Sequence, residues 1–151
     1  MASAVDTQHL QSKMFVRSYD HDPGATTAII ASPDGGTTKY SVDMSLFKNF
    51  LAQARPTVGD GFTKLEIVAA TDSAFTTPVV VKDSGTVAAD ALTDVVTLEC
   101  TAEELLSLGT SLRYVAARLT CPTNTNECNV TYIATGGRFN YQNQTADSVI
   151  A

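Results

Sequence analysis

The chain has no tryptophan, only three cysteines and few charges: Lys, Arg, Asp and Glu make up 17% of its 151 residues. A low charged share with many Thr, Ser, Asn and Gln residues favours strands, because Thr and Val pack well on a pleated surface. The formal net charge is -6, and no stretch of the chain gathers basic residues. The sequence therefore lacks the positive surface by which proteins bind nucleic acids or anionic membranes.

Long apolar runs and a leader sequence are also missing. The N-terminal stretch MASAVDTQHLQSK has no charged region followed by an apolar one, so it does not have the pattern of a secretory signal. No apolar run approaches the roughly 20 residues that a membrane-spanning helix needs. We therefore expect a protein that is made in a cytosol and has no membrane partner.

The two ends of the chain differ from its middle. Residues 1–13 and 141–151 are small or polar and show no hydrophobic periodicity, which predicts an N-terminal arm and a C-terminal tail. Residues 14–140 are then one domain, as the length of 151 residues suggests. The arms carry isolated apolar residues that we expect to contact a capsid or a neighbouring subunit: Val5, Leu10, Val149 and Ile150.

Strand patterns dominate the middle of the chain. Apolar and polar residues alternate over 64–71, 94–100, 112–119 and 128–134. This alternation predicts a mainly β fold, a single-domain sandwich of about eight strands. Asp34–Gly35, between two apolar runs, predicts a hairpin turn. One alternating set of residues 128–134 should face the core, together with Leu65, Ile67, Val115, Ala117 and Leu119.

Two short helices complete the predicted fold. Residues 45–56 place their apolar side chains on one helical face, and Pro56 would end that helix. Thr101 and Glu104 have the spacing of a capping box, which predicts a second helix that ends at Gly109 in a left-handed conformation and closes one end of the sandwich. The apolar face of the first helix would consist of Met44, Phe47, Phe50, Leu51 and Ala54.

Cys121 and Cys128 flank a polar loop, PTNTNE, between two facing strand patterns. Zinc sites use closer pairs, with roughly two to four intervening residues, and need four ligands, so we expect no metal. A Cys121–Cys128 disulfide is compatible with the spacing, whereas a cytosolic origin disfavours it. We predict free thiols near the loop and keep the disulfide as the open alternative. Cys100, in VVTLEC, has the pattern of a small core residue.

No group of residues has the pattern of a catalytic site. His21 stands between Asp20 and Asp22 in YDHDPG, and we predict a turn there, because no nucleophile motif accompanies this histidine. The glycine-rich stretches ASPDGG and ATGGRF lack the following helix and lysine of a phosphate-binding loop. Nothing in the sequence selects a carboxylate pair for glycoside hydrolysis. We therefore expect no enzyme and no cofactor.

Two stretches, KLEIVAATDSAFTTPVVVKDSG and LRYVAARLT, carry a family resemblance over residues 64–134. They resemble small bacteriophage proteins of the capsid decoration, or cement, type, in which a TDSAF turn and an RYVAARL strand recur within a jelly-roll-like sandwich. LRYVAARLT is also similar to a strand of galactose-binding and discoidin-like domains. Ala116 stands where those domains often have Arg, so no set of sugar-binding residues carries over.

The resemblance implies a structural virion protein that is made in the host cytoplasm. It would bind the outside of a phage capsid and stabilise it by bridging capsomers. Its partner would be the lattice of the major capsid protein, and the chain itself would form a homo-oligomer, a dimer or a trimer. Three classes remain open: a structural virion protein (for decoration, or elsewhere in the head or tail), a carbohydrate-binding jelly-roll module, and an unrecognised enzyme.

Overall fold

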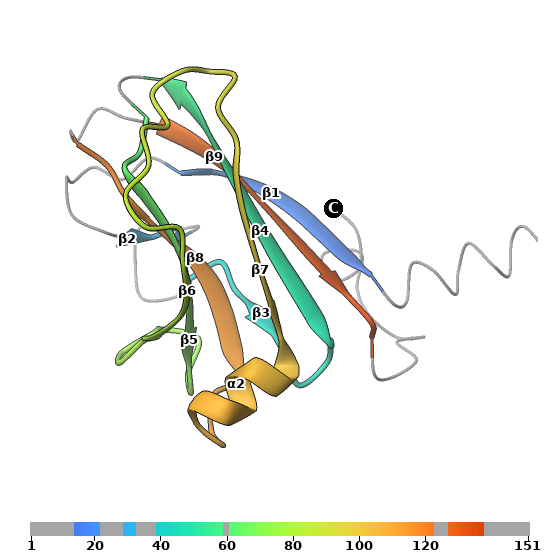
Figure 1. Ribbon diagram of the computed structural model, residues 1–151. Coiled ribbons are helices and arrows are strands. Elements are labelled where there is room, and N and C mark those ends of the chain that lie inside the picture. Colours follow the sequence, from blue (N-terminus) through green and yellow to red (C-terminus); the bar gives the residue numbers. More distant parts are fainter. Residues whose placement is uncertain (1–13, 22–28, 33–38, 59–60, 123–126, 138–151) are drawn as a thin grey trace, which may run out of the picture.

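The computed structural model describes residues 14–21, 29–32, 39–58, 61–122 and 127–137. They form two antiparallel sheets that pack face to face, which confirms the mainly β sandwich (Figure 1). In spatial order, the strands of sheet A are β1 (Phe15–His21), β9 (Glu127–Thr135), β4 (Asn49–Val58) and β7 (Val96–Thr101). Those of sheet B are β2 (Ile29–Ile30), β8 (Tyr114–Thr120), β5 (Lys64–Ala70) and β6 (Val79–Asp83), and β3 (Val42–Asp43) also pairs with β8.

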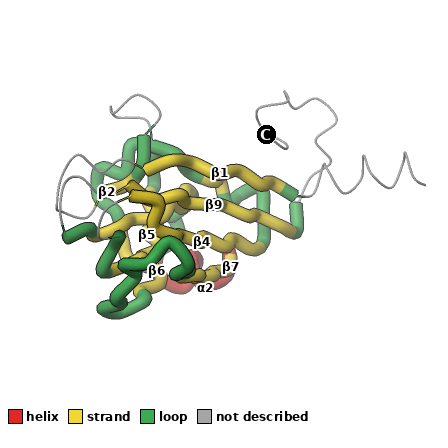
Figure 2. Tube along the Cα trace, turned by 90° about the horizontal axis from the view of Figure 1, so that it is seen from above, coloured by secondary structure: helices red, strands yellow, loops and turns green. Residues whose placement is uncertain are grey.

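Sheet A joins the two ends of the described chain. Phe15 of β1 pairs with Ala134 of β9, and Ala134 pairs on its other side with Phe50 of β4. Figure 2 shows β1, β9 and β4 running side by side. The described chain therefore begins and ends at one end of the sandwich, the end at which β7 leads into helix α2 (Ala102–Leu108).

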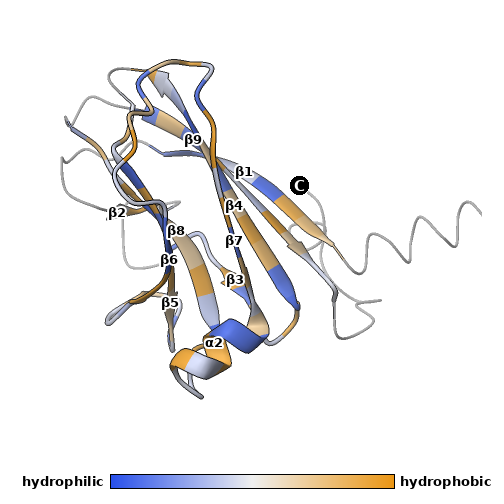
Figure 3. Cartoon of the chain, viewed as in Figure 1, coloured by the Kyte–Doolittle hydropathy of each residue, from blue (hydrophilic) through white to orange (hydrophobic). Residues whose placement is uncertain are grey.

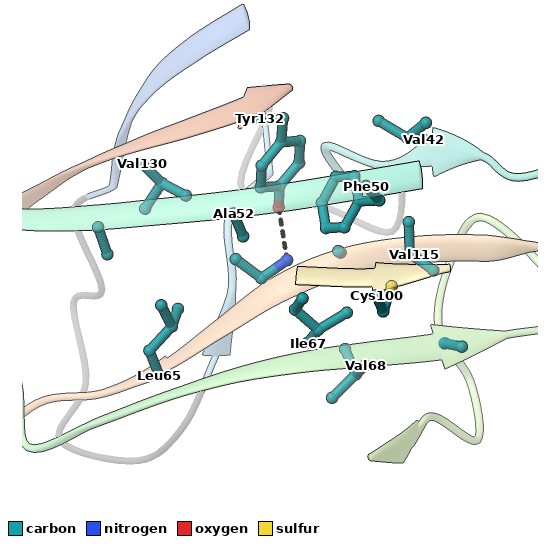
Figure 4. Packing of buried hydrophobic residues seen from close by; sticks show 14 of the residues in the cluster. Val42, Phe50, Ala52, Leu65, Ile67, Val68, Cys100, Val115, Val130 and Tyr132 are labelled. Atoms are coloured by element: carbon teal, nitrogen blue, oxygen red, sulfur yellow. Dashed lines mark hydrogen bonds between the residues drawn. The ribbon is translucent and has the colours of Figure 1, made fainter. Parts of the chain in front are cut away.

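The core lies between the two sheets, and burial alternates as predicted along β9. Strand β5 departs from the predicted alternation, because every residue from Leu65 to Ala70 is buried. Figure 3 shows apolar and polar residues along the strands. The five side chains predicted to face inward from 64–71 and 112–119 are all buried. From sheet A, the buried set of β9 is Cys128, Val130, Tyr132 and Ala134, one of the two alternating sets, as predicted. Figure 4 shows Tyr132 reaching from β9 across the core toward the opposite sheet.

The helix predicted over residues 45–56 is wrong, because this segment contains most of strand β4. Phe50, Ala52 and Ala54 are buried while Asn49, Gln53 and Arg55 are exposed, so the segment alternates with the period of a strand. The same residues also fit a helical face, and the pairing of β4 with β9 and β7 decides between the two. Before β4, the Asp43 side chain accepts the Ser45 N–H (2.9 Å) in a turn.

The second predicted helix is confirmed as α2, the single helix among the described residues. Thr101 accepts the Glu104 N–H (3.3 Å), and the Glu104 carboxylate accepts the Thr101 N–H (2.9 Å), which completes the capping box. The left-handed conformation predicted at Gly109 is wrong: its φ of 176° is extended backbone, and its N–H donates to the Leu105 carbonyl. In Figure 1, α2 closes one end of the sandwich.

The TDSAF segment forms a turn, as the resemblance implies. Asp72 organises this turn by accepting the Ala74 N–H (2.9 Å) with its side chain, while its carbonyl accepts the Phe75 N–H (3.2 Å). Phe75 has a positive φ of 55°, which is rare for a residue other than glycine, and its ring is buried. Such a backbone conformation costs about 1–3 kcal/mol. Burial of the Phe75 ring contributes a stabilisation of similar size, which offsets that cost.

Candidate interaction surface

The outer face of sheet A is a broad surface built from the residues between the inward-facing ones. Strand register aligns Val16, Ile133, Leu51 and Glu99 in one row across β1, β9, β4 and β7. The next row contains Ser18, Thr131, Gln53 and Thr97. The face thus combines a central apolar row with a row of hydroxyl and amide groups.

Hydrogen bonds between neighbouring strands hold the polar side chains of this face in place. Ser18 Oγ and Thr131 Oγ1 are 2.7 Å apart, and the Gln53 amide donates to Thr97 Oγ1 (3.4 Å). Asn129 donates to Asp20 (3.2 Å) at the far end of the face. Because short, mutually bonded side chains have little freedom left to lose, such a face can pack against another protein at a low entropic cost.

A hollow of about 470 Å³ opens where this face meets α2. Asn49, Leu51, Ile133 and Thr135 line it from sheet A, and the Lys82–Glu104 ion pair lies at its other side. The hydrogen bond between Lys82 and Glu104 raises the pKa of the lysine and lowers that of the carboxylate, so both groups stay charged near neutral pH. The hollow can therefore receive a polar or mixed segment of a partner.

A second, smaller groove of about 270 Å³ runs beside α2 and is mainly apolar. Met44, Leu105, Leu106 and Leu112 contribute its apolar lining, and Leu106 is more than half exposed. Arg113, which forms hydrogen bonds to both Asp43 carboxylate oxygens, stands at its edge. This groove lies at the end of the sandwich where the described chain begins and ends.

Sheet B carries a compact ion network around a buried carboxylate. Glu66 of β5 is 4% exposed and bonds Arg118 (2.7 Å) and Lys64 (2.9 Å), and Lys64 also reaches Asp83 (2.8 Å). Burial raises the pKa of Glu66, but the bonds from Arg118 and Lys64 outweigh that effect and hold the pKa below its ordinary value. The ion pairs of Glu66 with Arg118 and Lys64 give this network a structural explanation without a ligand.

Cys121 and Cys128 both lie at the end of the sandwich opposite α2. Cys128 begins the buried set of β9 in sheet A, while Cys121 directly follows β8 of sheet B. Interaction between the two thiols lowers the pKa of Cys121 and raises that of Cys128. Both are free thiols in this structure.

His21 completes this corner of the molecule, and the turn predicted at this residue is wrong. It is the last residue of β1, lies directly opposite Cys128 in the ladder, and is buried. Spacing along the sequence could not reveal this neighbour, because more than one hundred residues separate the two strands. Cys100, by contrast, is a buried core residue as predicted, and burial raises the pKa of its thiol to about 12.

The remaining predicted contacts lie outside the described residues. These are Val5, Leu10, Val149 and Ile150 of the two arms and the Asp34–Gly35 turn. Within the described part of the chain, no three His, Cys, Asp or Glu residues are grouped as metal ligands. That same part contains no helix long and apolar enough to cross a membrane.

Comparison with solved structures finds viral capsid or coat proteins and carbohydrate-binding modules among the matches. No family model matches the chain, and no curated protein matches it in sequence. It is similar to a decameric BFDV capsid protein, with a TM-score of 0.38 and 13% identity over 81% of this chain and 94% of that one. It is likewise similar to a family 29 carbohydrate-binding module, with a TM-score of 0.39 and 11% identity over 81% and 79% of the two chains. A Tobacco streak virus coat protein matches at a TM-score of 0.31 and 8% identity, over 82% and 88%. At such low identities and TM-scores, these similarities support no inference about what this chain binds.

Proposed function

We propose that the chain is a structural protein of a virus particle, and that it binds the outside of a phage capsid and bridges neighbouring capsomers. The observation that carries the proposal is the pairing of Phe15 with Ala134, which brings the two ends of the described chain together. Both terminal arms are thereby attached at one end of the sandwich. A single subunit can then extend two chain segments from one place toward its neighbours.

The length and composition of the arms support this role. A segment of 13 residues can reach roughly 40 Å when extended, enough to cross from one subunit to the next. The arms contain the apolar residues Val5, Leu10, Val149 and Ile150, separated by polar stretches. Ordering such an arm costs entropy, which many simultaneous contacts on a repeating lattice offset.

The outer face of sheet A supports the same proposal from the folded domain. Its apolar row of Val16, Ile133 and Leu51 is flanked by hydroxyl and amide groups, and the charged side chains of Glu99, Asp20 and Arg55 lie toward its edges. Protein interfaces of standard size have this composition, an apolar centre within a polar rim. A capsid surface is therefore a suitable partner for this face, with the arms adding contacts at its α2 end.

Deletion of residues 1–12 tests the proposal. We expect the shortened protein to fold, and to bind capsids encoded by the same genome at lower occupancy in a co-sedimentation assay. Particles carrying it should lose their contents at a lower temperature than particles carrying the intact protein. Val95→Ser, which changes an exposed apolar residue of the domain and leaves the arms intact, is the control.

Equal decoration by the shortened and intact proteins would overturn the role of the arm. Absence of capsid binding by the intact protein, together with selective binding on a glycan array, would instead favour a carbohydrate-binding module. That alternative draws on the hydroxyl and amide row of sheet A, whose side chains can bond sugar hydroxyls. Among the described residues of that face, however, there is no aromatic ring on which a sugar could stack.

A further inference from the structure

We propose that strand β7 is the place where two copies of this chain join, by antiparallel pairing of β7 with β7 of a second copy about a twofold axis. The two copies of sheet A would then form one continuous sheet. This inference goes beyond the proposed function and is tested on the isolated protein. It rests on the direction of the backbone groups of β7 and on the order of its side chains.

Strand β7 is an open edge of sheet A, because β4 lies on one side of it and no described strand pairs with the other (Figure 2). Directly after β7, the Ala102 N–H donates to the Lys48 carbonyl (2.8 Å), which continues the β7–β4 ladder. Backbone groups in an antiparallel pair alternate in direction, so the even-numbered residues of β7 point theirs at β4. The odd-numbered residues point away, as the bond from the Thr101 N–H to the Glu104 carboxylate (2.9 Å) shows. The N–H and C=O groups of Thr97 and Glu99 therefore lie along the open edge, ready to pair with another strand.

Strand β7 also lacks the features that keep strand edges apart. Lysine, proline and β-bulges at an edge prevent pairing with another chain. Strand β6, an edge of sheet B, has two of these features: its ladder with β5 shifts register between Ile67 and Val68, and it carries Lys82. Strand β7 pairs with β4 in regular register and contains neither lysine nor proline. The hollow of about 470 Å³ opens beside Glu99 and Thr101, which leaves room at this edge.

The order of side chains along β7 favours a second copy with Leu98 on the axis. Thr97 would then lie opposite Glu99 of the second copy, and both residues are exposed. The Thr97 hydroxyl accepts from Gln53, so its proton can be donated to that carboxylate. Centring the pair on Glu99 would place two like charges opposite each other, which is unfavourable. Centring it on Thr97 would leave each carboxylate opposite an apolar Val95.

The same pairing would cover apolar surface at the edge. Val96 and Leu98 point inward from β7 and are only partly buried against the core. A second strand beside β7 would place Leu98 against Leu98 of the second copy and Val96 against Cys100. A twofold axis perpendicular to the sheet keeps the two outer faces on one side. The dimer would therefore present the outer face of sheet A twice on a single continuous surface.

Sedimentation velocity of the purified chain at increasing concentration tests the interface. The native protein should form dimers, and Thr97→Pro should remain monomeric at the same concentrations. Proline removes an N–H that points away from β4, so this variant keeps its bonds to that strand and should fold. Thr97→Ala, the matched control, keeps the N–H and should still form dimers, with a dissociation constant raised less than about tenfold. Circular dichroism checks that both variants are folded.

Cysteine crosslinking tests the register and does not require the proline variant to fold. Across the open edge, Leu98 and its copy form a pair without mutual backbone hydrogen bonds, whose Cα atoms are roughly 4.5 Å apart. A disulfide can span that distance. Leu98→Cys should therefore give a covalent dimer on a non-reducing gel after mild oxidation. Thr97→Cys, which faces Glu99 of the second copy, should stay largely uncrosslinked, and the native chain with its three buried cysteines sets the baseline.

Several results would overturn this interface. They are a native protein that stays monomeric at every concentration, a Thr97→Pro variant that forms dimers as readily as Thr97→Ala, and crosslinking at Thr97→Cys in place of Leu98→Cys. If the native chain were monomeric and only Thr97→Pro lost capsid binding, a strand of the capsid protein would be the occupant of the edge instead. A dimer with this register that binds no capsid would contradict the proposed function and leave the interface in place.

Discussion

Gly61 and Gly85 have the same backbone φ of +68° but very different surroundings. A side-chain Cβ at Gly61 would lie 1.7 Å from the Ala89 carbonyl oxygen, and that oxygen accepts the Phe62 N–H (3.1 Å). At Gly85 a Cβ would meet nothing within 4 Å. Gly61 is therefore required by close packing as well as by its conformation, whereas Gly85 is favoured by conformation alone.

We expect Gly61→Ala to destabilise the fold by more than about 4 kcal/mol, because a backbone overlap adds to the unfavourable conformation. Gly85→Ala should cost about 1–2 kcal/mol, the cost of a left-handed alanine. Urea unfolding followed by circular dichroism measures both. Equal losses in the two variants would show that the chain near Gly61 can move away from Ala89.

Tyr132 supplies a hydrogen bond that the strands cannot. On one side, strand β8 pairs with β3 at Val115 and with β2 at Arg118. Ala117 lies between these two pairs, so neither short strand pairs with it. The Ala117 N–H donates instead to the Tyr132 hydroxyl (2.7 Å), which in turn donates to the Tyr40 carbonyl (3.3 Å). A phenol from sheet A thus fills a gap in the ladder of sheet B (Figure 4).

Tyr132→Phe should lower the free energy of unfolding by about 1–3 kcal/mol, because it leaves a buried N–H without its acceptor. Tyr40→Phe removes a hydroxyl from the same aromatic cluster, where the Tyr40 ring stacks on Tyr19 at 3.6 Å, and should change stability by less than about 0.5 kcal/mol. Chemical denaturation at a fixed pH compares the two. A Tyr132→Phe variant as stable as the native protein would contradict the role of the hydroxyl.

Glu66 gives the fold a dependence on pH whose direction is set by its ion pairs. Its pKa is held below the ordinary value of 4.5, so the network stabilises fully above about pH 5 and loses its contribution as the pH falls. Glu66→Gln should therefore reduce stability at neutral pH and flatten the decline that begins as the pH falls below about 5. Thermal midpoints across that range test it, and Glu103→Gln on α2 controls for the loss of one negative charge. An unchanged slope in Glu66→Gln would show that other carboxylates dominate acid unfolding.

Among the elements, β4 shows where sequence patterns fail. Its apolar residues fit a helical face and a strand face about equally well, because Leu51 adds an apolar residue between the buried Phe50 and Ala52. The place of the segment in the fold decides that it is a strand, because β4 lies between β9 and β7 and pairs with both. Pro56, interpreted as a helix stop, sits beyond the last pair with β7, where its missing N–H costs no bond to that strand.

Helix α2 shows the opposite case, since a local pattern was sufficient to predict it. The capping box needs only Thr101 and Glu104, and both of its hydrogen bonds are formed. Glu104 additionally bonds Lys82 of β6, so the helix start is tied to sheet B as well as to β7. Local chemistry predicted the helix, but only the fold could show this second contact.

Thr101→Ala should cost about 1 kcal/mol of stability by removing the acceptor for the Glu104 N–H. Ser107→Ala, which removes a hydroxyl from an exposed position of the same helix, should cost less than about 0.5 kcal/mol. Thermal unfolding of both variants in parallel separates the capping effect from a general effect on helix content. If the two losses are equal, the cap contributes nothing specific.

At the scale of the whole molecule, we expect the formation of sheet A to depend on its last strand along the chain, β9. Strand β9 lies between β1 and β4, and residues more than one hundred positions apart pair along it. We expect a chain ending at residue 121, which lacks β9, to remain unfolded, whereas a chain ending at residue 137 should fold. Far-UV circular dichroism and amide dispersion in NMR spectra distinguish the outcomes. A folded 1–121 fragment would mean that sheet B and the remaining strands suffice on their own.

These long-range pairings mark the limit of what the sequence could predict. Alternation located β5, β7, β8 and β9 and the buried residues Leu65, Ile67 and Leu119, because each side chain's face depends on its immediate neighbours. Which strand lies beside which depends on the packing of the whole chain. For that reason the meeting of His21 with Cys128, and the outer face of sheet A, appeared only in the fold.

The side-by-side placement of Phe15 and Ala134 also makes the domain a suitable scaffold for protein engineering. A passenger fused directly before Phe15 or after Gly137 would be attached at the α2 end, so the opposite end, with Cys121 and Cys128, would stay unmodified. A short linker between the two ends would allow new termini to be opened in a surface loop. Such a permuted chain would present its passenger from the other pole of the sandwich, while both sheets kept their strand order.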